Sequence, residues 1–294
     1  MTEPWAASSR IRLAGSWFTI DIGCEPAPGK GHDAVLVGPE FAAVADGATP
    51  LRGPGSTDAS SLAGDNQAVR NFSAAALDQL HAHRTLDVQA MFAAAITALG
   101  SSTAGAEPPG TCTVALVRGR GSELTVAVLG DCAAVLARTD GQVQVVHDDR
   151  VATLDDQVVA GLRQKLATGM NYQQAIQQLT PLLQANRRRH NTPDGYWVIG
   201  SDPAAATHVY TSSCPAELVE AVLVCTDGLT RLVSPFGWVN SYHDLLAQAR
   251  QHGLEQLAAQ VRTLERAPGS MLRSPRLGQH DDIAAVLLTR EPDA

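Results

Sequence analysis

Two short apolar runs, each followed by an acidic residue and a glycine, constrain this chain more than any other feature. Residues 221–225 form one run and lead into Asp227, while residues 41–45 form the other and lead into Asp46. A short, uninterrupted apolar run is typical of a strand that is buried on both faces. The sequence therefore predicts two core strands, each with a carboxylate at its end.

A third acidic site stands at the opposite end of an apolar run. Asp281 and Asp282 come directly before residues 283–288, which are apolar throughout. Oxygen ligands from several carboxylates are what hard divalent cations such as Mg²⁺ and Mn²⁺ prefer. If the three strand ends meet, they form a candidate site for such a cation.

The competing interpretation is structural, because Asp-Gly is a common turn dipeptide. The chain contains an example at Asp140-Gly141, which has apolar strand-like segments on both sides and reads as a hairpin. Neither Asp46 nor Asp227 is followed by a returning strand. On pattern alone, a metal site and a purely structural role both remain open.

The bulk composition limits the class of protein. With 294 residues, 45% hydrophobic residues and no linker or repeat, residues 1–294 are expected to form one domain. The net charge of −8 argues against nucleic acid as a partner. The start of the chain lacks an apolar signal core, no run is long enough to cross a membrane, and five cysteines without paired spacing fit a reducing compartment. We expect a soluble, cytoplasmic protein with no membrane partner.

The periodicity of apolar residues predicts both strands and helices. Helices are expected at residues 58–83, with Asp58 as the cap, at 86–99, at 155–189, with Thr180-Pro181 opening the last segment, and at 241–251 and 254–264. Strands are expected at residues 16–22, 34–37, 111–117, 124–129, 132–137, 142–146, 221–225 and 283–288. Residues 196–199 also look strand-like. Four of these strands follow one another without helices, which indicates an antiparallel sheet.

The order of the motifs resembles the metal-dependent protein phosphatases of the PP2C (PPM) type. The motifs are Val44-Ala45-Asp46-Gly47, Gly110-Thr111-Cys112-Thr113, Val128-Leu129-Gly130-Asp131, Cys225-Thr226-Asp227-Gly228 and Asp281-Asp282-Ile283. This resemblance spans nearly the whole chain. It implies an α+β fold, a four-layer α-β-β-α sandwich of two antiparallel sheets flanked by helices.

The resemblance also implies a cofactor, two Mn²⁺ or Mg²⁺ ions with a candidate third, and a set of residues that hold them. The implied metal ligands are Asp33, Asp46, the carbonyl of Gly47, Asp227 and Asp281, with Asp131 and Asp282 as candidates for an additional metal. Two such ions about 4 Å apart can bind a bridging water, lower its pKa and hold the phosphoryl oxygens. This chemistry requires no catalytic side chain beyond the metal ligands.

The chain departs from the family at several places. Lys30 stands where an arginine often binds the substrate phosphate, and Arg231 stands where an acid often assists the additional metal. We expect Lys30 and Arg231 to bind phosphate, with an ion pair to a neighbouring carboxylate as the alternative for Arg231. Residues 155–202 differ from the usual flap. These departures indicate a divergent bacterial branch, of which the actinobacteria are one candidate source.

Three functions follow from these observations. The first is a metal-dependent phosphatase that hydrolyses phosphoserine and phosphothreonine in proteins. The second is the same chemistry on a small phosphorylated metabolite, and the third is a non-catalytic relative that binds a partner. Acidic residues at all the core ligand positions argue against the third.

Overall fold

A computed structural model describes residues 5–48, 59–102 and 110–291 of the chain. The strands are β1 (Trp5–Leu13), β2 (Ser16–Glu25), β3 (Ala34–Gly38), β4 (Phe41–Ala48), β5 (Thr111–Arg120), β6 (Glu123–Leu129), β7 (Ala133–Arg138), β8 (Val143–His147), β9 (Tyr210–Pro215), β10 (Val219–Cys225) and β11 (Ile283–Arg290). The α-helices are α1 (Ala59–Ala82), α2 (Val88–Ser102), α3 (Arg150–Ala167), α4 (Tyr172–Arg187), α5 (Asp227–Thr230), α6 (Tyr242–His252), α7 (Leu254–Arg266) and α8 (Ser270–Arg273), and short 3₁₀ turns lie at Pro203–His208 and Ala216–Leu218.

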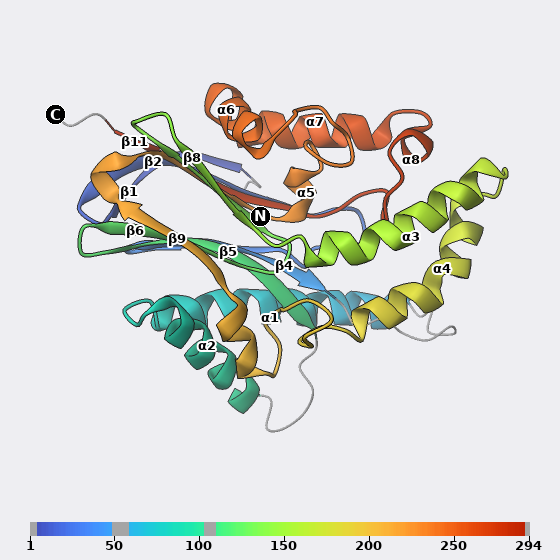
Figure 1. The fold of residues 1–294 in the computed structure, drawn as a ribbon, viewed down its shortest axis with the longest axis horizontal. Helices are drawn as coiled ribbons and strands as arrows, with labels where there is room; N and C mark the ends of the chain where they lie inside the picture. The colour runs from blue at the N-terminus through green and yellow to red at the C-terminus, as the bar shows by residue number, and fades with distance from the viewer. Residues whose placement is uncertain (1–4, 49–58, 103–109, 292–294) are drawn as a thin grey trace.

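The strands form two antiparallel sheets that pack face to face. The six-stranded sheet has the order β1-β2-β11-β10-β7-β8, and the five-stranded sheet has the order β3-β4-β5-β6-β9. Helices α6 and α7 cover the outer face of the first sheet, and α1 and α2 cover the outer face of the second (Figure 1). The expected α-β-β-α sandwich is confirmed.

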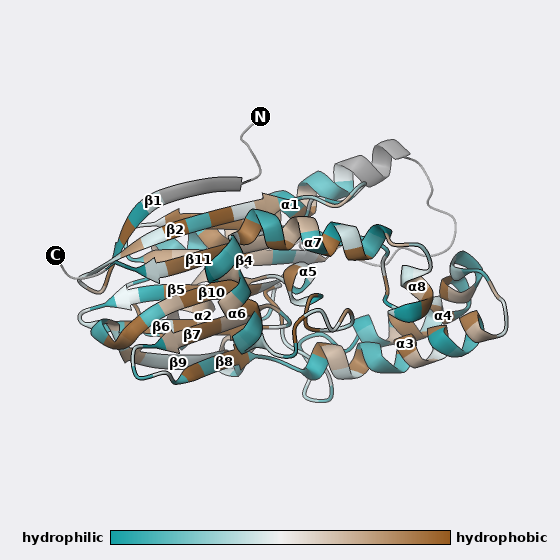
Figure 2. Cartoon of the chain, turned by 90° about the horizontal axis from the view of Figure 1, so that it is seen from above, coloured by the Kyte–Doolittle hydropathy of each residue, from teal (hydrophilic) through white to brown (hydrophobic). Residues whose placement is uncertain are grey.

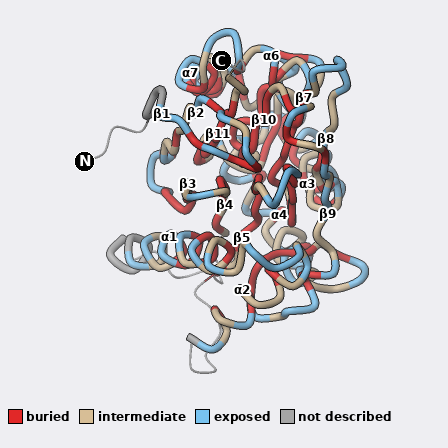
Figure 3. The backbone as a smooth tube through the Cα atoms, turned by 90° about the vertical axis from the view of Figure 1, so that its left-hand side faces the viewer, coloured by how far each residue is buried: buried red, intermediate tan, exposed pale blue. Residues whose placement is uncertain are grey.

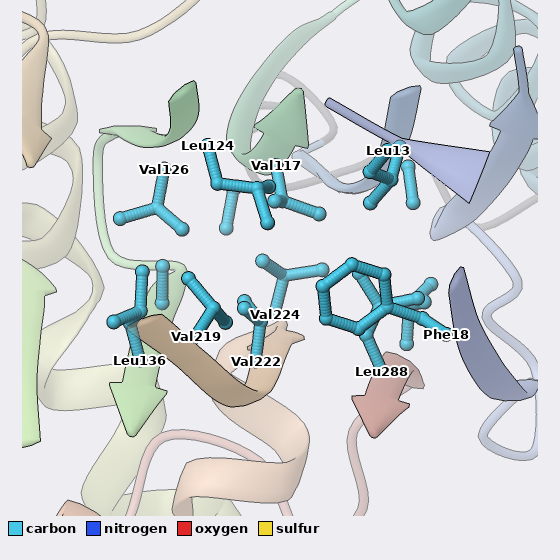
Figure 4. Close-up of a cluster of buried hydrophobic side chains, with 14 of the residues drawn as sticks. Leu13, Phe18, Val117, Leu124, Val126, Leu136, Val219, Val222, Val224 and Leu288 are labelled. Carbon is cyan, nitrogen blue, oxygen red and sulfur yellow. The ribbon is translucent and has the colours of Figure 1, made fainter. Parts of the chain in front are cut away.

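Alternation of side chains explains why the core strands read as continuous apolar runs. In β10, Val222 and Val224 point between the sheets, while Ala221, Leu223 and Cys225 pack beneath the helices. Both faces of the strand are therefore buried, as expected of a strand in the middle of a sandwich. Figure 4 shows the inter-sheet cluster, in which side chains of β10 face side chains of the opposite sheet. Buried backbone accordingly concentrates in the two sheets, with exposed residues on the helices (Figure 3).

Two strands were not expected from the sequence, and both lie at sheet edges. β1 and β9 each pair on one side only in the described structure. In β9 only Cys214 is buried, so its sequence lacks an apolar run. The strand-like residues 196–199 form only isolated bridges, and the proposed cap Asp58 lies outside the described residues. No helix among those described combines the length and the apolar character needed to cross a membrane.

The helical segment between β8 and β9 is a hairpin, and its break is not where the sequence suggested. The prediction that Thr180-Pro181 opens the last segment is wrong, because Pro181 lies inside α4. The chain turns instead at Gly169, whose φ of +85° suits glycine. Asn171 then begins α4 by accepting a hydrogen bond from the Gln174 N–H. The α3–α4 hairpin projects from one end of the sandwich (Figure 2).

Candidate active site

The strand registers bring the predicted acidic residues to one end of the sandwich. Asp33 precedes β3 and Asp46 ends the core of β4, and these strands pair at Ala34 and Ala45. Asp227 follows β10 and Asp281 precedes β11, and these strands pair at Cys225 and Ala285. This is the end from which the α3–α4 hairpin projects.

Burial and mutual repulsion raise the pKa values of three of these carboxyl groups. Burial is the largest cause for Asp33, Asp46 and Asp227, followed by the charge of a neighbouring aspartate in each case. The pKa of Asp227 rises to about 7. The charge of Arg231, and after it a hydrogen bond between the side chains of Asp46 and Asp227, oppose part of that rise. Several buried acids that repel one another are stabilised by a nearby positive charge.

The donor set fits a hard divalent cation. Asp33 is 3% exposed, and its Oδ2 atom is buried with no hydrogen-bond partner among the described residues. A buried carboxylate oxygen without a partner is costly unless a ligand satisfies it. Within the same residues no three His, Cys, Asp or Glu side chains are already gathered tightly enough to hold an ion. The fit therefore rests on the chemistry of the donors and on the free oxygen of Asp33.

The glycines of the two Asp-Gly pairs serve close packing and not a turn. A Cβ atom on Gly228 would lie 1.8 Å from the Asp282 carbonyl oxygen, and one on Gly47 would lie 2.7 Å from the His32 carbonyl oxygen. By contrast, Gly141 has a φ of +83° and nothing within 4 Å of its Cβ position. Of these three glycines, Gly141 is the one for which the turn interpretation holds. At the other two positions, glycine lets the acidic strand ends approach one another.

Asp282 has a different environment from the other acids. Its Oδ1 accepts a hydrogen bond from the Ala27 N–H at 2.6 Å. Its Oδ2 accepts from the N–H groups of Gly31 at 2.9 Å and His32 at 2.6 Å. The carboxylate thus fixes the loop that carries Lys30, and its oxygens are already satisfied by backbone donors.

We expect Asp282→Ala to lower the free energy of unfolding by about 3 kcal/mol, because three buried N–H groups would lose their acceptor. Asp282→Asn is the matched control, since it keeps one acceptor oxygen, and it should lose less than half as much. Urea unfolding followed by tryptophan fluorescence measures both. An Asp282→Ala protein as stable as the wild type would show that this carboxylate does not hold the loop.

Asp131 is linked to the site through Thr113, and a further acid joins it from the hairpin. The Thr113 hydroxyl donates to Asp131 Oδ1 at 2.7 Å, and Thr113 pairs with Asp46 across β4 and β5. Asp155 of α3 lies close enough to raise the pKa of Asp131, after the larger effect of burial. Burial and the charge of Asp227 raise the pKa of Asp155 itself to about 6. The sequence did not single out Asp155, because it reads as part of a solvated helix.

Asp281 lies between two cationic side chains. Lys30 Nζ lies 2.6 Å from Asp281 Oδ1, and Arg231 Nη2 lies 2.5 Å from Asp281 Oδ2. Burial tends to raise the pKa of Asp281, but Arg231 and then Lys30 lower it more, so the net shift is downward. This carboxylate therefore remains charged in the absence of a metal ion.

Arg231 makes the ion pair that the sequence left open as an alternative to phosphate binding. Besides Asp281, it contacts Glu265 Oε1 through Nη1 at 2.8 Å. Glu265 has a side-chain exposure of 0% and also binds Arg262 and His280, each at 2.8 Å. The sequence did not identify Glu265, which looked like one acid of an amphipathic helix. Its buried contacts fix Arg231 beside the site.

Comparison with known proteins agrees with this geometry. The family model described as protein phosphatase 2C matches residues 32–262. No curated protein matches the sequence of the chain.

Several solved structures are similar to the chain. A bacterial serine phosphatase carrying a point mutation is 12% identical, with 94% of this chain and 99% of that chain covered and a TM-score of 0.51. The catalytic domain of the serine/threonine phosphatase PstP, in complex with two manganese ions, is 18% identical, with coverage of 94% and 98% and a TM-score of 0.48. RsbX in complex with magnesium is 13% identical, with coverage of 93% and 96% and a TM-score of 0.46. At these identities the likeness concerns the fold.

The family match covers most of the chain and includes Asp33, Asp46, Asp131 and Asp227. These are the acids that the fold gathers at one end of the sandwich. The chain therefore belongs to the protein phosphatase 2C family and is a metal-dependent phosphatase.

Proposed function

We propose that the chain hydrolyses phosphoserine and phosphothreonine in proteins with the help of two Mn²⁺ or Mg²⁺ ions. The proposed ligands are Asp33, Asp46, the carbonyl of Gly47, Asp227 and Asp281. The observation that carries the proposal is the buried, unpartnered Oδ2 of Asp33. After the larger effects of burial and of Asp282, the charges of Asp281 and Asp227 also act on this carboxyl group and raise its pKa. Asp131 is proposed for an additional ion, whereas we assign Asp282 to the loop that it holds.

Divalent ions supply two things when bound here, namely a water of lowered pKa and positive charge for the phosphoryl oxygens. The side chains of this chain supply the rest. The aspartates offer short, anionic oxygens from rigid strand ends. Thr113 fixes the orientation of Asp131 by donating to Oδ1. Lys30 and Arg231 place positive charge beside Asp281, where it can attract an anionic substrate.

A small phosphorylated metabolite is the second candidate substrate, and the hairpin is the observation that favours it. The Tyr172 hydroxyl of α4 donates to the Leu277 carbonyl at 2.6 Å, which ties the hairpin to the loop before β11. The charges of Lys30 and Arg231 act on the Tyr172 hydroxyl, so this tie lies beside the site. A hairpin held there restricts the approach of a bulky substrate.

We also infer a reducing, cytoplasmic setting. All five cysteines are free, and all but Cys24 are buried. Burial raises the pKa of the Cys225 thiol to about 12 and leaves it protonated and unreactive at neutral pH. Such residues behave as small core side chains, which supports a compartment without disulfide formation.

Hydrolysis of p-nitrophenyl phosphate and of phosphoserine and phosphothreonine peptides, with and without Mn²⁺, tests this proposal. We expect activity on all three that is lost in EDTA and restored by Mn²⁺. A higher kcat/KM for phosphopeptides than for small phosphate esters supports a protein substrate, and the reverse supports a metabolite. Absence of Mn²⁺-dependent hydrolysis of any phosphate monoester would refute the proposed activity.

A further inference from the structure

The carboxylate of Asp281 is engaged at both oxygens, which distinguishes it from the other proposed ligands. Lys30 holds Oδ1 and Arg231 holds Oδ2. By contrast, one oxygen of Asp33 is buried without a partner. A cation that uses Asp281 must therefore share it with a side chain or release one.

The two cationic side chains differ in how firmly they are held. Arg231 has a side-chain exposure of 8%, and its second partner is the fully buried Glu265. Moving Arg231 would leave Glu265 short of a partner in a buried position, which is costly. Arg231 is therefore a fixed part of the site.

The Lys30 side chain is held by fewer contacts than Arg231, although its loop is fixed. Its side-chain exposure is 39%, and Asp281 is the hydrogen-bond partner found for its ammonium group among the described residues. The backbone on both sides of Lys30 is held by Asp282, through Ala27 and Gly31. A flexible four-carbon side chain on a fixed loop can leave one oxygen and reach others nearby.

The Lys30 ammonium group interacts electrostatically with three aspartates. Asp281 is in contact, and the charges of Asp227 and Asp46 also reach it. The ammonium group thus lies on the Asp281 side of the acidic cluster and offsets part of its negative charge. A divalent cation placed there would be repelled by Lys30 at close range.

We propose that Lys30 is a tethered cation that competes with one of the two divalent ions for Asp281. This inference rests on the proposed function for the ligand set, but it concerns binding and not turnover. The site then binds one ion tightly through Asp33, Asp46 and Asp227. It binds the other more weakly, and Lys30 leaves Asp281 as that ion binds.

Titration of the metal-free protein with Mn²⁺, followed by calorimetry and by the electron paramagnetic resonance signal of unbound Mn²⁺, tests the competition. In Lys30→Gln we expect the weaker of two Mn²⁺ dissociation constants to fall about tenfold, with the tighter one changed much less. Lys165→Gln is the matched control, because Lys165 is the only other lysine and binds Gln178 on the surface of the hairpin. It removes the same charge and should leave both constants unchanged. Lys30→Arg should keep two separate constants, because it retains the cation.

Amine labelling of the wild type with mass spectrometry gives a readout that does not depend on affinity. Lys30 should react faster when Mn²⁺ is present, while Lys165 in the same sample should not change. Equal Mn²⁺ binding by Lys30→Gln and wild type, or labelling of Lys30 that Mn²⁺ does not alter, would overturn the competition. Phosphatase activity is measured separately in EDTA and Mn²⁺, so an active enzyme with equal binding curves rejects this inference and leaves the proposed function standing.

Discussion

Asp227→Asn is expected to lower Mn²⁺-dependent turnover of p-nitrophenyl phosphate at least about 100-fold, or ~2.7 kcal/mol in the activation barrier. Asn has the shape of Asp but lacks the charge that a divalent ion requires of this position. The fold should persist, because an Asn amide can donate to Asp46 where the two carboxyl groups now share a hydrogen bond. Asp78→Asn, an exposed change on α1, is the matched control and should keep full activity. Unchanged turnover of Asp227→Asn at limiting Mn²⁺ would remove Asp227 from the ligand set.

The same variant should be more stable than the wild type when both lack metal. The pKa of Asp227 rises from its ordinary value of 3.8 to about 7 in the folded state, so the folded protein binds more protons than the unfolded chain between these values. The contribution of Asp227 to the stability of the metal-free wild type therefore falls as pH rises from about 4 to about 7, and stays low above that. Asn does not titrate, so its advantage should be largest at pH 8 and vanish near pH 4. Thermal unfolding in EDTA across this range measures the difference, and an advantage that is independent of pH would contradict the assignment.

Gly228→Ala is expected to cost at least about 3 kcal/mol of unfolding free energy, the upper range for overpacking a core. The new Cβ atom would lie 1.8 Å from the Asp282 carbonyl oxygen, which is backbone and cannot rotate away. The chain can relieve this overlap only by separating α5 from the start of β11. That movement also draws Asp227 away from Asp281, so metal binding should weaken together with stability.

Gly64→Ala is the matched control for this prediction. Gly64 lies within α1 and has nothing within 4 Å of its Cβ position. The same chemical change should there stabilise the protein by about 0.5–1 kcal/mol, because alanine favours helix over glycine. Urea unfolding of the two variants should therefore shift in opposite directions. A Gly228→Ala protein that unfolds at the wild-type urea concentration would show that α5 and β11 are not closely packed.

The core strands and the acidic residues at their ends could be predicted from the sequence, because each is marked by a local sequence pattern. A run that is apolar on both faces, such as residues 221–225, predicts a strand between two layers, and the register then places Asp227 without further information. The edge strand β9 could not be predicted in this way. This strand pairs with one neighbour only and buries only Cys214. Its other side chains can therefore be polar, and the sequence lacks the apolar run that would predict a strand.

The residues of the site that the sequence did not identify act through tertiary contacts. Asp155 and Glu265 are both acids on helices with an ordinary amphipathic pattern. Whether such an acid faces solvent or the site depends on the orientation of the helix about its own axis against the sheet. The pattern of apolar residues does not determine that orientation to better than one or two residues. For Arg231 the sequence supplied two roles, and the partner that favours the ion pair, Glu265, lies 34 residues away.

The pairing of β2 with β11 has a consequence for how the site forms during folding. Asp21 on β2 is the register partner of Leu287 on β11, a separation of 266 residues (287 − 21). Strands β3, β4, β5 and β6 pair largely with near neighbours and can associate early, whereas closing so long a loop is slow. Asp281 and Asp282 stand at the start of β11, so they reach Lys30 and its loop only when this strand is inserted. Insertion of β11 should therefore be the step at which the folding chain acquires its affinity for metal ions.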